Sequence, residues 1–213
     1  IADNGLNANS TGLLRLLSRN LNIDGQVNAQ QLEAVTGTNA YDYVTGKATA
    51  IAGTGTAGQY AIDSTLLGGL YAHRISLIST EQGVGVRMAG DAAASVADFT
   101  LSAAGNIQLN NQISSKQAIE IQSSSTQQQK LNIQGRLTAN NISIGDANGQ
   151  KLNVDVEGGT LYAGSTLDLQ SQAFNANNAK IQAKDVLKVN AKADIALQNT
   201  LLDAADLQVK SNT

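Results

Sequence analysis

The stretch FTLSAAGNIQLNNQISSKQAIEI, residues 99–121, decides the fold of this chain. It opens and closes on two apolar residues separated by one polar residue, Phe99/Leu101 and Ile119/Ile121. This alternation places two side chains on one face of a strand and the residue between them on the other. Such pairs recur down the C-terminal half of the chain: Phe99/Leu101, Ile119/Ile121, Ile142/Ile144, Leu167/Leu169, Leu187/Val189 and Leu207/Val209.

The pairs start 20, 23, 25, 20 and 20 residues apart. A period near twenty is typical of a β-solenoid, in which each coil stacks on its neighbour because one coil cannot bury its own apolar face. A second strand belongs to the coil, as in Ile107/Leu109 followed by Ile113. The polar residues 123–129 and 146–151, which lengthen two coils, are expected in outer loops. About ten coils of roughly 20 residues would make a rod of roughly 50 Å.

The composition suits such a rod. Hydrophobic residues make up 42% of the chain, aromatic residues 3% and charged residues 15%, so uncharged polar residues must cover most of the surface. There is no Pro to interrupt a strand ladder and no Cys for a disulfide, a thiolate metal site or a nucleophile. A net charge of −3 and few aromatic residues disfavour nucleic-acid binding. No apolar run is long enough to predict a membrane-spanning helix.

The N-terminal third is less regular. The leucines of residues 13–17 fit one face of a helix, although so short a run fits a strand equally well. A similar turn is suggested by Asp63-Ser64 before an apolar run. We therefore expect an all-β fold with short helical turns near residues 11–18 and 64–71. The segment 46–58, rich in Gly, Thr and Ala, is expected to be a surface loop.

Residues 68–90, GGLYAHRISLISTEQGVGVRMAG, combine a double Gly, an aromatic residue, a Thr-Glu pair and a Gly-x-Gly in fixed order. The segment resembles a motif of the filamentous-haemagglutinin-like exoproteins of two-partner secretion. That family includes large adhesins and the stalks of contact-dependent growth-inhibition toxins. Residues 22–29 and 35–39 resemble the segment that closes the family's secretion domain. The sequence departs from the motif at Met88, where the family usually has Asn.

The resemblance implies a right-handed parallel β-helix, in agreement with the twenty-residue period. It also implies that residues 1–72 are the C-terminal part of a secretion-domain-like β-helix with irregular coils. Residues 73–213 would then be regular shaft repeats, continuous with the first part. The family's early Asn-Pro turn motif is missing from this Pro-free chain. We therefore expect a fragment of a longer exoprotein that is not competent for export by itself.

No group of residues predicts a catalytic, cofactor-binding or metal site. Gly53–Gly58 match G-x-G-x-x-G, but the flanking residues predict neither the strand nor the helix that a dinucleotide site needs. Asp155 and Glu157 are expected on one face of a strand, roughly 7 Å apart along it. A glycosidase uses a pair of carboxylates of this kind. Without an aromatic platform nearby in the sequence, we expect them to be solvated surface acids.

The other polar features are expected to be structural as well. His73 is the only His and cannot form a histidine metal site by itself. Arg74, Arg87 and Glu81 are expected to form ion pairs that order the start of the regular coils; a binding face is the functional alternative. Residues 146–149 have the composition of a calcium loop but lack its later acid, and they predict a tight turn.

The leading hypothesis is a non-enzymatic, extracellular β-solenoid shaft that holds a receptor-binding or toxic region away from a bacterial surface. The resemblance implies a cognate outer-membrane transporter for the full-length protein. It also implies a receptor or glycan on a host or neighbouring cell, and a location outside or on the surface of a Gram-negative bacterium. The alternatives are a carbohydrate-active β-helix enzyme and a fragment that itself binds a glycan or receptor. We expect no small-molecule cofactor, and end-to-end self-association through unpaired strand edges.

Overall fold

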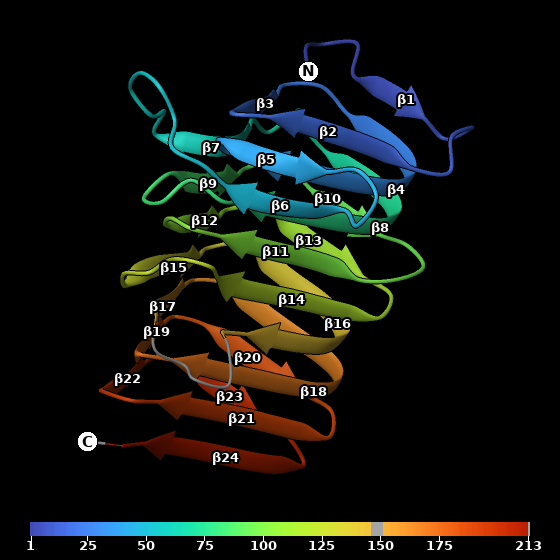
Figure 1. Cartoon of the computed structure of the whole chain (residues 1–213). Helices are drawn as coiled ribbons and strands as arrows, with labels where there is room; N and C mark the ends of the chain where they lie inside the picture. The colour runs from blue at the N-terminus through green and yellow to red at the C-terminus, as the bar shows by residue number, and fades with distance from the viewer. Residues whose placement is uncertain (146–150, 213) are drawn as a thin grey trace.

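The computed structural model describes residues 1–145 and 151–212, and Figure 1 shows them as one stack of short strands. The described chain forms a β-solenoid of about nine turns without a helix, which confirms the predicted fold class. It follows that no helix in this part is long and apolar enough to cross a membrane. The main path joins nine parallel strands: β1(Leu6–Ala8), β4(Val27–Thr36), β8(Leu70–Ser79), β10(Ala92–Ala94), β13(Gln112–Ser115), β16(Arg136–Ile144), β18(Thr160–Ser171), β20(Lys180–Ala183) and β23(Leu201–Asp203).

Each coil has three faces. The first face consists of the nine strands of the main path, of which β4, β8, β16 and β18 contribute only their first halves. These four long strands bend around one corner, and their later halves belong to the second face. The second face also contains β2(Leu14–Ser18), β11(Phe99–Ala103), β14(Ala118–Ser123), β21(Val186–Ala191) and β24(Asp206–Ser211). The third face is a separate parallel sheet of β3(Leu21–Ile23), β7(Tyr60–Ser64), β9(Gly85–Met88), β12(Ile107–Leu109), β15(Gln129–Ile133), β17(Leu152–Glu157), β19(Ala173–Asn177) and β22(Ile195–Gln198).

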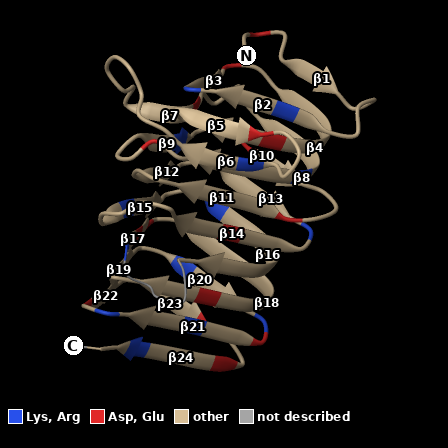
Figure 2. Cartoon of the chain, viewed as in Figure 1, with Lys and Arg blue, Asp and Glu red and all other residues tan. Residues whose placement is uncertain are grey.

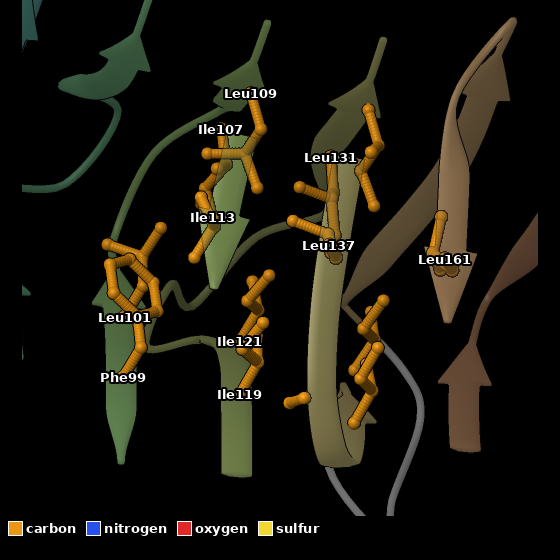
Figure 3. Close-up of a cluster of buried hydrophobic side chains, with 14 of the residues drawn as sticks. Phe99, Leu101, Ile107, Leu109, Ile113, Ile119, Ile121, Leu131, Leu137 and Leu161 are labelled. Carbon is orange, nitrogen blue, oxygen red and sulfur yellow. The ribbon is translucent and has the colours of Figure 1, made fainter. Parts of the chain in front are cut away.

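The core lies between the faces as files of aliphatic side chains. Phe99 is in register with Ile119, and Leu101 with Ile121, as the spacing of the pairs predicts. Figure 3 shows these side chains pointing into the same interior as Ile113 and the residues of the third face. From Ile75 onward the inward residues of the second face are at most 1% exposed until the last strand: Ile75, Leu77, Phe99, Leu101, Ile119, Ile121, Ile142, Ile144, Leu167, Leu169, Leu187 and Val189.

The short helical turns expected near residues 11–18 and 64–71 are wrong. Residues 14–18 form β2, which pairs in parallel with β4 and places Leu14 opposite Leu32. The free hydrogen-bonding edge of β4 favours a strand, because a helix would leave that edge unpaired. Residues 65–69 form a turn between β7 and β8, in which the Gly68 amide donates to the Thr65 carbonyl at 3.0 Å.

Candidate functional site

One excursion interrupts the solenoid, between β4 and β8. There β5(Asn39–Asp42) and β6(Lys47–Ala50) form an antiparallel hairpin. Val27 is in register with Leu70, so this coil takes 43 residues, whereas the coil from Phe99 to Ile119 takes 20. Figure 1 shows the hairpin lying across the outside of the second face. The hairpin therefore adds a surface to the early coils that the regular coils do not have.

A cluster of polar and aromatic contacts holds the hairpin to the second face. The Tyr41 hydroxyl donates to Glu33 at 2.9 Å, and the Arg15 Nε donates to the same carboxylate at 3.0 Å. The Arg15 guanidinium also lies 5.2 Å from the centre of the Tyr41 ring, a cation–π arrangement. Burial and the bond to Glu33 raise the pKa of Tyr41. Val35 points outward beneath this cluster and is only 2% exposed, which is unusual for the outside of a solenoid.

A second clamp joins the first coil, the loop after the hairpin and the segment 68–90. Arg19 forms a two-pronged contact with Glu81, with Nε donating at 3.0 Å and Nη2 at 2.7 Å. Its Nη1 donates to the Thr54 carbonyl at 2.8 Å. The hydrogen bond from Arg19 lowers the pKa of Glu81, which keeps the carboxylate charged although its side chain is only 14% exposed. The Thr-Glu pair of the motif therefore anchors the hairpin loop.

Two glycines of the motif, Gly68 and Gly85, sit where neighbouring coils touch. A Cβ atom on Gly68 would lie 1.8 Å from the Ile23 carbonyl oxygen, and one on Gly85 would lie 2.8 Å from the Asn106 carbonyl oxygen. Backbone from the adjacent coil occupies both places, so a larger residue would push the coils apart. Gly68 and Gly85 thus have a packing role in this chain, whereas Gly83 has nothing within 4 Å of its Cβ position and adopts a positive φ of 78°.

The motif also shapes the outside of the third face. Arg87 binds Asp63 of the preceding coil through Nε at 2.8 Å and Nη2 at 2.7 Å, and its guanidinium lies 4.6 Å from the centre of the Tyr60 ring. Beside Tyr60 is a cavity of about 310 Å³, here called the third-face cavity. Its described lining is Gln59, Tyr60, Gly83, Gly85, Asn106, Ile107, Gln108, Lys130 and Asn132.

Asp155 and Glu157 do share the outward side of β17, since Val154 and Val156 between and beside them are fully buried. Asp155 binds Lys130 Nζ at 2.6 Å and accepts a hydrogen bond from Asn175 at 2.7 Å. The hydrogen bond to Asp155 raises the pKa of Lys130. These contacts link three successive coils, β15, β17 and β19, and so serve to hold them together.

The remaining predicted features lie apart from one another. His73 and Arg74 are exposed at the bend of β8 between the first and second faces. Gly53–Gly58 lie in the mostly exposed loop between β6 and β7. Residues 146–149, the predicted tight turn, lie outside the described residues. Within the described part, no three His, Asp or Glu residues gather into a metal-binding cluster.

The sequence interpretation missed the hairpin and the third-face cavity. A signal for the hairpin was present in the chain. Tyr41 and Tyr43 alternate around Asp42, whose carboxylate accepts a hydrogen bond from the Val44 amide at 2.8 Å, and Gly46 adopts a positive φ of 70° at the turn. The cavity left no local signal, because its walls come from four strands and loops that only the stacking brings together.

Comparison with known proteins agrees with this architecture. The TPS secretion domain family matches residues 1–109. The chain therefore belongs to the two-partner secretion (TPS) exoproteins, as its motif suggested. The match covers the hairpin, both of its clamps and the Gly-rich segment. No solved structure matches the chain.

Several similar proteins are far longer than this chain. A protein named tRNA nuclease CdiA of Yersinia mollaretii is 33% identical over 197 residues, which is 92% of this chain and 6% of that protein. A tRNA nuclease CdiA-2 of Burkholderia pseudomallei is 44% identical over 106 residues, 50% of this chain and 3% of that protein. The filamentous hemagglutinin of Bordetella pertussis is 35% identical over 116 residues, again 50% and 3%. The chain thus spans a small fraction of these relatives.

Proposed function

We propose that this chain is a rigid shaft segment of a TPS exoprotein and presents a distal receptor-binding or toxic region. The continuous parallel ladder from β1 to β24, with buried files inside it, supports this proposal most strongly. Such a stack resists bending because parallel ladders bond neighbouring coils on three faces. In this proposal residues 1–72 close the secretion domain and residues 73–213 form the first shaft repeats, so the family match to residues 1–109 extends into the first shaft coils.

Membership of the TPS family implies a cognate outer-membrane transporter for the full-length protein and secretion to the Gram-negative cell surface. We place the contact with a host or neighbouring cell on other parts of the long exoprotein or on the outer faces of the coils. Figure 2 shows Lys and Arg scattered singly among Asp and Glu on the visible side. A surface of this kind is suited to solubility more than to binding one highly charged partner.

The proposed role is mechanical and not enzymatic. Two relatives are named as tRNA nucleases, but the chain aligns with only 3% and 6% of their lengths. The stretch matched by the family is its secretion domain. In the carbohydrate-enzyme alternative, Asp155 and Glu157 would supply the acid pair. Asp155 is instead bound to Lys130 and Asn175, and Glu157 accepts a hydrogen bond from Gln134 at 3.4 Å.

A deletion that preserves the coil register tests the shaft role. Leu167 is in register with Leu187, so removing residues 167–186 deletes one coil and lets Thr166 take the place of Val186. We expect the full-length exoprotein with this deletion to be secreted and to retain adhesion or toxin delivery, since a shaft tolerates a small change of length. Removing residues 167–176 should abolish secretion of folded protein, because it puts the next strands out of register. Loss of function after the in-register deletion, with folding retained, would contradict the shaft role.

The third-face cavity favours a second candidate function, in which the segment itself binds a ligand outside the cell. The two functions are compatible, because the cavity lies on the outside of a continuous stack.

A further inference from the structure

The third-face cavity exists because two of its lining residues are glycines, which have no side chain to fill it. Gly83 and Gly85 leave a hollow where the outer surface would otherwise be covered, and its other lining residues come from β7, β12, β15 and the adjoining loops. These strands lie at the left of Figure 1. Its volume of about 310 Å³ is at the lower end of the range of small-molecule sites in proteins. Gly85 cannot be enlarged without striking the Asn106 carbonyl, so packing between the coils itself keeps the hollow open.

One wall of the cavity is an aromatic ring held in place from outside. Tyr60 is one of only five Tyr residues in a chain without Trp. Arg87 lies 4.6 Å from the centre of its ring, and the two-pronged ion pair with Asp63 fixes that arginine. The ring is therefore oriented before any ligand arrives, which lowers the entropy cost of binding against it.

The lining of the cavity is rich in amides and includes an unused acceptor. Gln59, Gln108 and Asn132 contribute side-chain amides. The Asn132 Oδ1 atom is buried and has no hydrogen-bond partner among the described residues. A buried acceptor without a donor is costly, so a hydroxyl that donates to it would gain more than an ordinary surface hydrogen bond.

The charges around the cavity are already neutralised. Lys130 carries the only charge among its described lining residues, and it is bound to Asp155 at 2.6 Å. Arg87, behind the ring, is bound to Asp63 at 2.7 Å. An anionic ligand would have to compete with these carboxylates, whereas a neutral polyhydroxylated ligand would not.

We propose that the third-face cavity is a binding site for a neutral glycan. One sugar ring packs against Tyr60, and its hydroxyls bond with Asn132 and Gln108. These two residues belong to one outward file of the third face, since Gln108 is in register with Asn132 and Asn132 with Asp155. Neighbouring positions in such a file are about 4.8 Å apart, so further sugar units can follow the axis of the solenoid. This inference rests on the second candidate function and is independent of the shaft role.

The test is titration of the 213-residue chain with cellohexaose, chitohexaose and maltohexaose as neutral probes and a heparin hexasaccharide as the anionic probe, followed by calorimetry and by NMR. We expect at least one neutral probe to bind. Tyr60→Ala should weaken that binding about tenfold and Tyr60→Phe should restore it, because the ring and not the hydroxyl makes the contact. Asn132→Ala should weaken it roughly three- to tenfold, the loss of one hydrogen bond.

Asn153→Ala is the matched control, because Asn153 faces outward one coil beyond Lys130 and does not line the cavity. We expect it to bind like the wild type, and thermal melting of every variant shows whether the fold is kept. Three results would overturn the proposal: no neutral probe binds, only heparin binds, or binding survives both Tyr60→Ala and Asn132→Ala. None of them bears on the shaft role, since residues 167–186 lie outside the cavity.

Discussion

The substitution Ile121→Asp tests the inward files directly. Ile121 is 1% exposed and lies between Leu101 and Ile144 in the second face, so a polar group placed there has no contact with water. Loss of the buried aliphatic side chain costs about 2–3 kcal/mol. The new carboxyl must then either stay charged in an apolar interior or take up a proton.

The free-energy cost of burying the charged carboxylate introduced at position 121 cannot exceed the cost of protonating it. Holding an aspartic acid neutral at pH 7, when its ordinary pKa is about 3.9, costs about 4 kcal/mol. Burying the neutral carboxyl without a full set of partners adds about 1–3 kcal/mol. The total of about 7 kcal/mol or more is comparable to the whole stability of a typical domain. At about 2–4 °C per kcal/mol for a chain of this size, the melting temperature should fall by at least about 15 °C.

Gln122→Asp provides the control, because Gln122 is the exposed neighbour on the same strand. A surface change of this kind alters stability by about 0.5 kcal/mol or less, which is roughly 2 °C. Thermal unfolding followed by circular dichroism compares the two variants at pH 7. The sign of the pH effect is a second check: burial raises the pKa of the introduced carboxyl, so the deficit of Ile121→Asp should shrink as the pH falls towards 4. Equal melting temperatures at pH 7 would refute the assignment of inward and outward positions.

Three further outcomes are expected. Gly68→Ala should destabilise by about 3 kcal/mol or more, because its Cβ would meet a backbone carbonyl at 1.8 Å, whereas Gly12→Ala, with nothing within 4 Å, should melt like the wild type. Glu81→Gln should speed amide hydrogen exchange in residues 39–50 and leave β14 unchanged. Acid should do the same to the wild type: the folded pKa of Glu81 is below the ordinary value of 4.5, so its stabilisation is present above pH 4.5 and is lost as the pH falls through the folded value. Finally, β24 pairs with β21 but leaves Leu207 and Val209 46% and 45% exposed, and we expect these apolar side chains to support self-association of the 213-residue chain. Val209→Lys should reduce this association in sedimentation velocity; a monomeric wild type at high concentration would contradict this.

The regular coils could be predicted because the pattern that defines them lies within single strands and in the spacing between consecutive strands. Alternation within a strand identifies Ile119 and Ile121 as inward, and the spacing to Phe99 sets the stacking register. The pattern of residues 13–17 was ambiguous, and the free edge of β4 decided it in favour of a strand.

The hairpin and the cavity could not be predicted in the same way, because contacts between distant residues create them. Arg19 and Glu81 are 62 positions apart, and nothing near either residue indicates the other. Arg87 and Asp63 are 24 positions apart, one coil of the third face. Their pairing becomes evident only when the register of β7 and β9, with its irregularity between Tyr60 and Ile62, is known. Sequence patterns thus predicted the periodic part of the molecule and missed the parts that depart from the period.

The unequal lengths of the coils have a consequence for extension under force. A chain pulled by its two ends should unwind from an end, one coil after another, since each coil is bonded only to its neighbours. A regular coil of 20 residues would release about 70 Å of contour length, whereas the 43-residue coil that carries the hairpin would release about 145 Å. In single-molecule stretching, the hairpin coil should therefore give one large extension step among the smaller steps of the regular coils. This step should require a higher force, because the contacts of Arg15 with Glu33 and of Arg19 with Glu81 must break first.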